Sequence, residues 1–300
     1  MSNKKIPVIL DTDIGFDIDD TWALGLLLKC PELDVKLITT VSHDTHIKAR
    51  IVAKFLECAN RTDIPIGIGP QKNSNKGSLY NWVKNYDLSN YPGIIYKDGI
   101  EAISSTIEDS NGFISLIAIG PLGNIAEALK LNSKIIENPC FIGMHGSIFI
   151  GYKGRPIPTV EYNVFSDFTA CRKVFQAPWK KTITPLDTCG KIVLSGDNYT
   201  HIMDCDNLVV NVIKECFEIW AEKTGLRRLI NKDHKTSVLF DTVAIYLALS
   251  EDLVNIEDLK LEVSETGFTI ISNDGNMIRG ATSWKDLPAF KKFIVNRLIN

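Results

Sequence analysis

Five aspartates lie within ten positions of one another near the start of the chain, in the segment DTDIGFDIDD (11–20). The segment directly follows the apolar run IPVIL (6–10), which is typical of a buried strand. Neighbouring carboxylates repel one another. Burying an unpaired carboxylate costs roughly several kcal/mol, because the charged group loses its hydration. A compensating positive charge is therefore expected at this strand end, and a bound hard cation would supply it.

Polar residues also follow the other apolar runs of the sequence. SHD (42–44), GPLGN (120–124), MHGS (144–147) and the loop GYKGRPIPTVEYN (151–163) each come after such a run. Because ligands of open parallel sheets bind beyond the carboxyl ends of the strands, we expect these loops to converge on one cleft. They offer mostly oxygen atoms, which favours Ca²⁺ or Mg²⁺ over zinc.

A simpler interpretation of the first segment is a solvated acidic loop that caps a helix. It accounts for Asp19 and Asp20, which open the helical pattern DDTWALGLLLK (19–29), where acids suit the helix dipole. It does not account for Asp11 and Asp13, because they stand at the end of the preceding strand. We therefore favour a functional site over a capping loop.

Alternating strand and helix patterns must hold these residues in place. Runs rich in Val and Ile predict strands at 6–10, 35–41, 64–69, 113–120, 140–146 and 180–186. Helical spacing of apolar residues predicts helices at 19–29, 46–61 and 121–131. The segment KLEVSETGFTIISNDGNMIRGAT predicts a β-hairpin with NDGN at its turn. We expect an α/β fold: an open, mostly parallel, Rossmann-like sheet with helices on both faces and a small β-hairpin near the C-terminus.

Composition narrows the class of protein. The hydrophobic fraction of 45% suits a buried core, and no linker or repeat divides residues 1–300, so a single domain is expected. The net charge of −3 favours neither nucleic acid nor an anionic membrane as a partner. Seven scattered cysteines without a C-x-x-C pair fit a reducing, cytoplasmic compartment. No apolar stretch has the length of a signal peptide or a membrane span.

The segment DTDIGFDIDDTWAL (11–24) resembles the N-terminal signature of the nucleoside hydrolases, D-T-D-x-G-x-D-D-x-x-A, with two extra residues between the halves. Other segments resemble motifs of this inosine/uridine-preferring family in the same order: TTV (39–41), RTDIPIGIG (61–69), IAIGPLGNIAEAL (117–129), VEYN (160–163) and FDTVAIYLAL (240–249). The family cleaves the N-glycosidic bond of ribonucleosides, as in purine and pyrimidine salvage. The resemblance implies the same fold and activity for this chain.

The resemblance also implies one Ca²⁺ per subunit and a homodimer or homotetramer. Asp13, Asp20 and Asp241 would supply carboxylate ligands, and the main-chain carbonyl of Gly123 would replace that of the family's Thr in G-P-L-T-N. Water molecules and ribose hydroxyls would complete a shell of about 6–8 oxygens.

The resemblance assigns the reaction to a water molecule that attacks the anomeric carbon while Asp13 takes its proton. Six residues would contact the nucleoside: Asp19, Asp44, Met144, Glu161, Asn163 and Asp241. Of these, Asp19 and Asp241 would hold ribose hydroxyls, and Glu161 and Asn163 the 5′ and 3′ side of the sugar. An E-x-N match is also common in residues that merely cap a loop, so that alternative stays open for the last two.

Three departures from the family pattern concern the substrate side. Asp44 stands where the family commonly has Asn, and Arg155 where well-known members have an Asn near the sugar. Phe240 replaces the His that precedes the late Asp and that protonates the leaving base in purine-active members. The role of Asp17, which lies in the two-residue expansion, is left open.

Phe240 leaves the donor of the leaving-group proton unassigned. His43 and His145 both follow strands and are candidates, although a lone His is more often structural. Arg227 and Arg228 precede the segment of Asp241 and could close over substrate, with a solvated charge cluster as the alternative. Five aromatic residues could stack on the base instead, although packing in the core is the more common role of such residues: Trp82, Tyr152, Phe217, Trp220 and Phe240.

Two other functions remain open at this point. A haloacid-dehalogenase-like phosphatase also has D-x-D after its first strand, but here the usual D-G-T continuation is missing. A binding protein that keeps the cation and ribosyl site without turnover is the second alternative, because the family's leaving-group His is absent.

Overall fold

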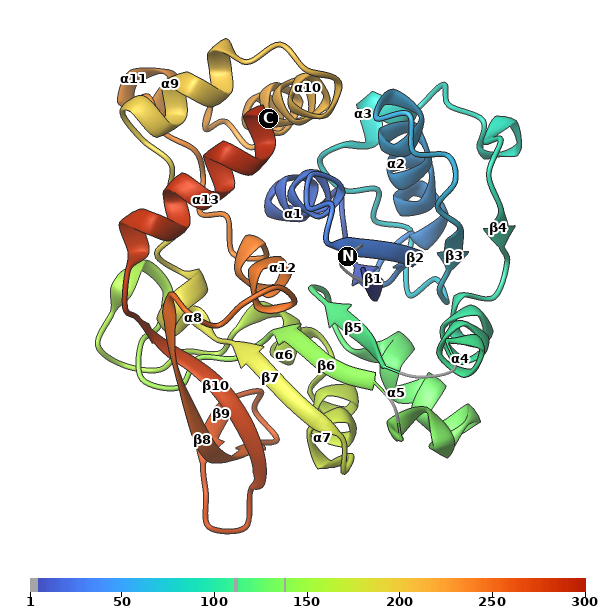
Figure 1. Cartoon of the computed structure of the whole chain (residues 1–300), viewed down its shortest axis with the longest axis vertical. Coiled ribbons are helices and arrows are strands. Elements are labelled where there is room, and N and C mark those ends of the chain that lie inside the picture. The colour runs from blue at the N-terminus through green and yellow to red at the C-terminus, as the bar shows by residue number, and fades with distance from the viewer. Residues whose placement is uncertain (1–4, 111–112, 138) are drawn as a thin grey trace.

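The computed structural model describes residues 5–110, 113–137 and 139–300. They form a ten-stranded sheet in the order β4-β3-β2-β1-β5-β6-β7-β10-β8-β9, with helices on both faces (Figure 1). The strands are β1 (Ile6–Thr12), β2 (Leu33–Thr40), β3 (Ile66–Ile68), β4 (Ile95–Tyr96), β5 (Ile114–Ala118), β6 (Pro139–Met144), β7 (Lys180–Thr184), β8 (Val254–Val263), β9 (Thr269–Ile271) and β10 (Asn276–Trp284).

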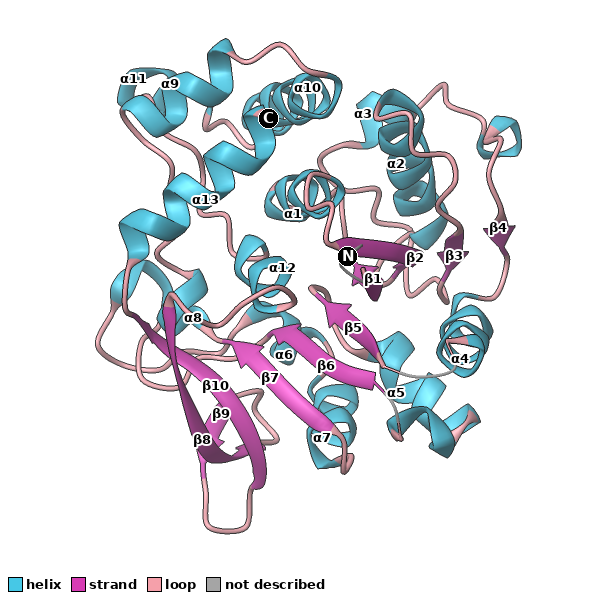
Figure 2. Ribbon diagram, in the orientation of Figure 1, coloured by secondary structure: helices cyan, strands magenta, loops and turns pink. Residues whose placement is uncertain are grey.

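Helices follow most of the strands, as Figure 2 shows. The α-helices are α1 (Asp19–Leu28), α2 (Thr45–Cys58), α3 (Tyr80–Val83), α4 (Gly99–Asp109), α5 (Gly123–Leu131), α6 (Tyr162–Ser166), α7 (Phe168–Gln176), α8 (Leu186–Cys189), α9 (Asp197–Asp204), α10 (Leu208–Lys223), α11 (Arg227–Asp233), α12 (Thr242–Leu247) and α13 (Leu287–Ile299). Short 3-10 helices are η1 (Leu88–Asn90), η2 (Ser133–Ile136) and η3 (Tyr152–Gly154). The expected mostly parallel α/β fold is confirmed.

The strand order reverses at β1. This strand pairs in parallel with β2 on one side, where Val8 lies opposite Val35, and with β5 on the other, where Val8 lies opposite Ser115. Because the chain leaves β1 and β5 toward different neighbours, the loops that follow these strands separate and leave a crevice at the carboxyl edge. The acidic segment follows β1 and therefore lies at this crevice.

Alternation along the strands explains how the sheet buries both faces. Val8 and Leu10 pack in one hydrophobic cluster, with residues of α1, α2 and α10, while Ile9 packs in a second cluster with residues of α4, α5 and α7. Successive side chains of a strand point to opposite faces, so a continuously apolar strand supports a helix layer on each side. The positions of the strand ends are thus held from both sides.

The C-terminal hairpin differs in detail from the prediction. β8 is the central strand and pairs antiparallel with both β9 and β10. The residues between β8 and β9 (264–268) form the hairpin turn, whereas NDGN joins β9 to β10, which lie on opposite sides of β8. β10 also pairs in parallel with β7, so this antiparallel part continues the main sheet. The pairing is long-range and no local turn signal encodes it.

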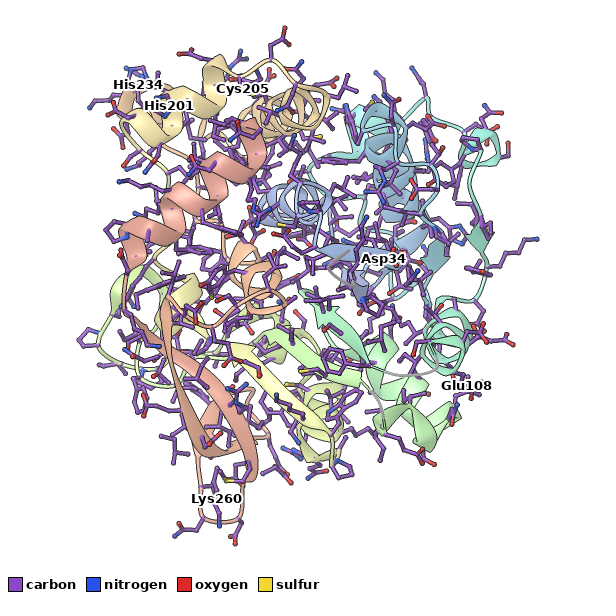
Figure 3. All side chains as sticks on the ribbon, in the orientation of Figure 1. Asp34, Glu108, His201, Cys205, His234 and Lys260 are labelled. Atoms are coloured by element: carbon purple, nitrogen blue, oxygen red, sulfur yellow. The ribbon has the colours of Figure 1, made fainter. Side chains whose placement is uncertain are left out.

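The remaining observations concern the segment 71–98 and the surface. The segment has no clear hydrophobic periodicity in its sequence, yet it contains α3, η1 and the two-residue β4. Charged side chains such as Glu108 and Lys260 project from the periphery (Figure 3). Within the described ranges, the helices lack the combined length and apolarity that crossing a membrane requires.

Candidate active site

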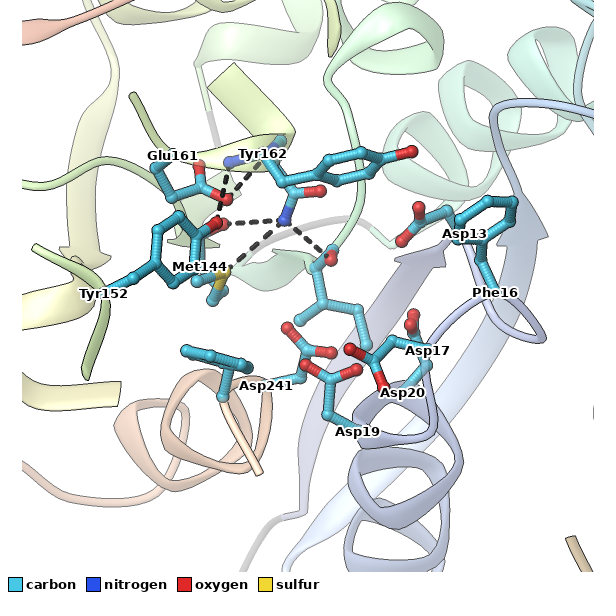
Figure 4. A pocket seen from close by; sticks show the side chains of 13 residues that line it. Asp13, Phe16, Asp17, Asp19, Asp20, Met144, Tyr152, Glu161, Tyr162 and Asp241 are labelled. Carbon is cyan, nitrogen blue, oxygen red and sulfur yellow. Dashed lines mark hydrogen bonds between the residues drawn. The ribbon is translucent and has the colours of Figure 1, made fainter. Parts of the chain in front are cut away.

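A cavity of about 310 Å³ lies in the crevice at the carboxyl edge of the sheet. The loop between β1 and α1 (13–18), which we call the acidic loop, forms one wall. Gly15 in this loop has a left-handed φ of 98°. A volume of this size holds one small ligand. The lining residues are Asp13, Phe16, Asp17, Asp19, Asp20, Ile119, Met144, Tyr152, Glu161, Tyr162, Asn163, Phe240 and Asp241 (Figure 4).

Three buried carboxyl groups converge at one end of the cavity. Oxygen atoms of Asp19, Asp20 and Asp241 lie within 4.8 Å of one another, and their carboxylates face each other in Figure 4. Asp19 and Asp20 open α1, while Asp241 immediately precedes α12. The hydroxyl of Thr12 donates a hydrogen bond to Asp20. Asp241 thus lies beside two aspartates that precede it by more than two hundred positions. We call Asp19, Asp20 and Asp241 the acid cluster.

The electrostatics of the acid cluster call for a cation. Burial raises the pKa of Asp19, Asp20 and Asp241 well above the usual range, and repulsion between the carboxylates adds to the rise. Carboxylates in such a site are either protonated or neutralised by a positive charge. Three hard oxygen donors at this spacing fit Ca²⁺ or Mg²⁺, so the residues present suit the expected group.

Asp13 faces the cavity from a separate side of the acidic loop (Figure 4). Burial raises its pKa, while the positive charges of Lys48 and His43 act in the opposite direction. The ammonium of Lys48 is buried and donates hydrogen bonds to the main-chain carbonyls of Asp13 and Ile14. A fixed cation therefore lies directly beneath the loop that carries the aspartates.

Asp11, in contrast, is buried outside the lining of the cavity. One carboxylate oxygen accepts hydrogen bonds from the hydroxyl of Thr39 at 2.6 Å and from the amide of Asn124 at 2.8 Å. Burial raises its pKa to about 7. Asp11 connects β1 to β2 and α5, which is a supporting role.

The wall opposite the acid cluster comes from β5, β6 and α6. The amide of Asn163 donates hydrogen bonds to the carbonyls of Ile119 at 3.0 Å and of Met144 at 3.1 Å. The carboxylate of Glu161 caps α6 and accepts from the main-chain N–H groups of Gly146, Asn163 and Val164. Glu161 and Asn163 therefore serve as caps and ties and also line the cavity.

Two of the residues expected from the sequence lie elsewhere. Asp44 is the N-cap of α2, where it accepts from the N–H of Ile47 at 3.1 Å, and it does not line the cavity. Gly123 is the first residue of α5 and lines a separate depression that also contains Lys72 and Asp167. Asp44 thus begins the helix that follows β2, and Gly123 begins the helix that follows β5.

The charged candidates outside the acidic loop also lie away from the cavity. Arg155 is exposed and does not line it. Arg227, in α11, forms ion pairs with Glu218 at 3.2 Å and Glu222 at 3.7 Å, which matches the solvated-cluster alternative. Neither Arg227 nor Arg228 lines the described cavity.

The aromatic candidates divide into two groups. Tyr152 and Phe240 line the cavity and contact each other edge-on with ring centroids 6.0 Å apart. Trp82, Phe217 and Trp220 belong to the hydrophobic core, and the ring of Phe217 stacks on that of Trp220. Only the first two are therefore in position to contact a ligand.

The histidines divide similarly. His145 is fully buried, its Nε2 lies 3.0 Å from the carbonyl of Gly120, and burial lowers its pKa to about 4. His43 lies beside the cavity, with its ring stacked on that of Phe16 and its Nε2 3.1 Å from the hydroxyl of Tyr162. His201 and His234 lie at the α9–α11 end of the molecule (Figure 3).

Sequence reasoning gave no role to five residues at the site: Phe16, Asp17, Lys48, Ile119 and Tyr162. Lys48 had a local signal, because it stands on the apolar face of α2, between Ile47 and Ile51. Tyr162 belongs to the segment VEYN, but the resemblance assigned only its two neighbours. Phe16 and Asp17 fall in the expansion of the acidic segment, which no pattern interpreted.

Comparisons with known proteins indicate the family of this chain. The family model described as inosine-uridine preferring nucleoside hydrolase matches residues 8–292. A protein named probable uridine nucleosidase 2, from Arabidopsis thaliana, is 27% identical over 96% of this chain and 92% of its own length. The pyrimidine-specific ribonucleoside hydrolase RihA of Escherichia coli is 27% identical over 72% of each chain.

Solved structures show the same fold. The plant nucleoside hydrolase PpNRh1 superposes with a TM-score of 0.81 over 98% of this chain and 99% of its own, at 19% identity. A purine-preferring ribonucleoside hydrolase from Gardnerella vaginalis superposes with a TM-score of 0.79 over 97% and 98%, at 20% identity. With the family model covering nearly the whole sequence, the chain belongs to the inosine-uridine preferring nucleoside hydrolase family.

Proposed function

We propose that this protein hydrolyses the N-glycosidic bond of a ribonucleoside to free base and ribose, with Asp13 as the general base. The observation that carries the proposal is the position of Asp13, which faces a cavity whose adjacent end holds the acid cluster. The family assignment supports the reaction class. It also disfavours the haloacid-dehalogenase-like phosphatase considered from the sequence.

The acid cluster is the proposed cation site, with Ca²⁺ as the proposed ion. Asp20 and Asp241 would supply carboxylate ligands, with Asp19 beside them and Asp13 contributing from across the cavity. For the main-chain ligand we propose the carbonyl of Ile119, since Ile119 lines the cavity and Gly123 does not. Ca²⁺ in this position would lower the pKa of water and offset the charge of the aspartates.

The protein's own residues supply the remaining steps. Asp13 removes one proton from water, the water oxygen bonds to the anomeric carbon, and the electrons of the C1′–N bond move to the base. Asp19 and Asp241 are proposed to bind the ribose hydroxyls, and Met144, Glu161 and Asn163 to contact the rest of the sugar. Asp44 is removed from this proposed set because it caps α2 outside the cavity.

The position of Lys48 supports Asp13 as a base. Burial alone favours the protonated carboxylic acid, which cannot accept a proton from water. The nearby ammonium of Lys48 opposes this effect and favours the carboxylate. Lys48 therefore favours the form of Asp13 that can accept a proton from water.

The test is an assay of ribose release from purine and pyrimidine nucleosides, with and without a chelator, using wild type and Asp13→Asn. We expect ribose release in the presence of Ca²⁺ and a loss of about 10²–10⁴-fold in kcat in the variant. Asp98→Asn, at the exposed N-cap of α4, is the control and should keep wild-type activity. Undiminished turnover by Asp13→Asn would overturn the mechanism.

A second candidate is a ribosyl-binding protein without turnover, which the presence of Phe240 at the family's His position favours. It predicts calorimetric binding of ribose or a nucleoside by wild type, with no base released during long incubation. The same preparation can also be examined for the proposed homodimer or homotetramer by light scattering.

A further inference from the structure

Three aromatic rings from segments that are remote in sequence meet beside the cavity. The ring of Phe16 stacks on that of His43 with centroids 4.7 Å apart, and it is nearly parallel to the ring of Tyr162 at 6.5 Å. Nε2 of His43 lies 3.1 Å from the hydroxyl oxygen of Tyr162. Figure 4 shows the ring of Tyr162 extending from the side of Glu161 toward Asp13 and Phe16.

The two ends of the cavity differ in chemistry. The acid cluster offers oxygen atoms that suit a cation and sugar hydroxyls, whereas the other lining side chains include four aromatic rings, Phe16, Tyr152, Tyr162 and Phe240. We call these four residues the aromatic rim. If the proposed function holds, ribose lies at the acid cluster and the flat base lies against the aromatic rim.

A leaving base needs a proton, because cleavage places an electron pair on its nitrogen. Phe16 and Phe240 have no transferable proton. The hydroxyl of Tyr152 accepts a hydrogen bond at 3.0 Å from the main-chain N–H of Tyr162, an amide that cannot return a proton to it. Buried His145 is directed toward the carbonyl of Gly120 and does not line the cavity.

Within the aromatic rim, Tyr162 combines an exposed side chain with a contact to a second group that can carry a proton. Its side chain is 41% exposed, and its hydroxyl contacts Nε2 of the half-buried His43. The other ring nitrogen of His43 lies 3.3 Å from Oδ1 of Asn73. A chain of hydrogen-bonding groups therefore runs from Asn73 through the imidazole to the hydroxyl at the cavity.

The backbone holds His43 in an unusual conformation. Ser42 and His43 both have left-handed φ values, 67° and 51°. The carbonyl of His43 accepts from the N–H groups of Lys72 at 3.0 Å and Asn73 at 3.4 Å, which ties this loop to the next one. Residues kept in sparsely populated backbone regions cluster at functional sites, because the surrounding structure must enforce them.

Resting on the proposed function, we infer that Tyr162 is the general acid for the leaving base and that His43 reprotonates it. The hydroxyl proton of Tyr162 passes to the base nitrogen as the C1′–N bond breaks and its electron pair moves to that nitrogen. The Nε2 proton of His43 then passes to the Tyr162 oxygen. Asp13 releases the proton taken from water, and His43 regains one from solvent, so the protons balance.

The surroundings of the pair are consistent with these roles. Burial raises the pKa of Tyr162, so the hydroxyl keeps its proton until a partner demands it. Burial and the charge of Lys48 lower the pKa of His43, while the hydrogen bond with Asn73 opposes the decrease. The other charged groups near the imidazole are Asp13 and Lys72, which act in opposite directions.

The decisive experiment compares two substrates in wild type and Tyr162→Phe. A ribonucleoside needs a proton on its leaving base, whereas p-nitrophenyl β-D-ribofuranoside releases a phenolate that is stable without one. We expect kcat of Tyr162→Phe to fall about 10²-fold on the nucleoside and to stay near wild type on the nitrophenyl riboside. Tyr96→Phe on β4, where the side chain is also 41% exposed, is the matched control.

His43→Gln tests the second member of the pair. The same selective loss on the nucleoside is expected, and combining it with Tyr162→Phe should add little further loss, because both act in one proton transfer. Equal slowing of both substrates by Tyr162→Phe, in a variant with wild-type thermal unfolding, would overturn the inference and leave the proposed function intact. Failure of wild type to hydrolyse either substrate would instead overturn both.

Discussion

The ammonium of Lys48 lies 3.0 Å from the carbonyl oxygen of Ile14 and also donates to the carbonyl of Asp13. A buried lysine thus holds the start of the acidic loop through two main-chain contacts rather than through an ion pair. Burial lowers its pKa, while Asp13 and Asp20 oppose the decrease. Lys48 supplies positive charge beside the buried carboxyl groups of Asp13 and Asp20.

Replacing this lysine should destabilise the fold. Lys48→Met keeps the length of the side chain but leaves two carbonyls without their donor and the acids without their cation, so we expect a loss of about 3 kcal/mol in the free energy of unfolding. Urea denaturation measures it. Lys130→Met, which removes an exposed lysine paired with Glu127, should change stability by less than about 1 kcal/mol. Equal losses in both variants would contradict the role given to Lys48.

Cation binding should depend on the acid cluster. Adding Ca²⁺ to chelator-treated wild type should raise the thermal unfolding temperature, and at about 100 times the dissociation constant the gain is roughly 2.7 kcal/mol. Asp20→Asn should abolish this gain because it removes a carboxylate of the cluster. Asp98→Asn serves as the control for loss of an aspartate. An unchanged calcium response in Asp20→Asn would place the ion elsewhere.

His145 should make stability depend on pH. Its folded pKa is about 4, below the ordinary value of 6.5, so the unfolded chain binds more protons between these values and stability falls as pH falls from 6.5 to 4. The full effect is about 3 kcal/mol. Urea unfolding at pH 7 and pH 4.5 should show a smaller loss in His145→Gln than in wild type, whereas exposed His201→Gln should match wild type. Identical pH dependence in His145→Gln and wild type would contradict the assignment.

Gly15 should tolerate no side chain. A Cβ there would lie 2.4 Å from Cδ1 of Ile51, and φ is 98°. Because this φ is strained for any residue with a Cβ, Gly15→Ala should shift the acidic loop, and we expect a loss of about 2 kcal/mol in stability together with most ribose-releasing activity. Gly196 also has a positive φ, 57°, but a Cβ added there would meet nothing within 4 Å, so Gly196→Ala should keep kcat. Retained kcat in Gly15→Ala would argue against the loop's role.

Much of the site followed from local patterns. Apolar runs identified β1, β2 and β5, and the rule that loops meet at the carboxyl edge of a parallel sheet brought Asp13, Asp19 and Asp20 into one crevice. The presence of Asp241 at the site was predicted from the resemblance, since no sequence feature around Asp241 indicates an acidic partner near the N-terminus. The placements of Asp44 and Gly123 could not be foreseen, because a residue just after a strand can open the next helix instead of facing the crevice.

The sequence by itself determined the alternation of strands and helices, the reaction class implied by the ordered motifs and the concentration of acids at one strand end. Those features are encoded by residues close together in the chain, where period and spacing are visible. Only the tertiary structure brought Lys48 beneath Asp13 and joined His43 to Tyr162, which is 119 positions away. Contacts of that kind depend on how separate loops pack, and no local period records them.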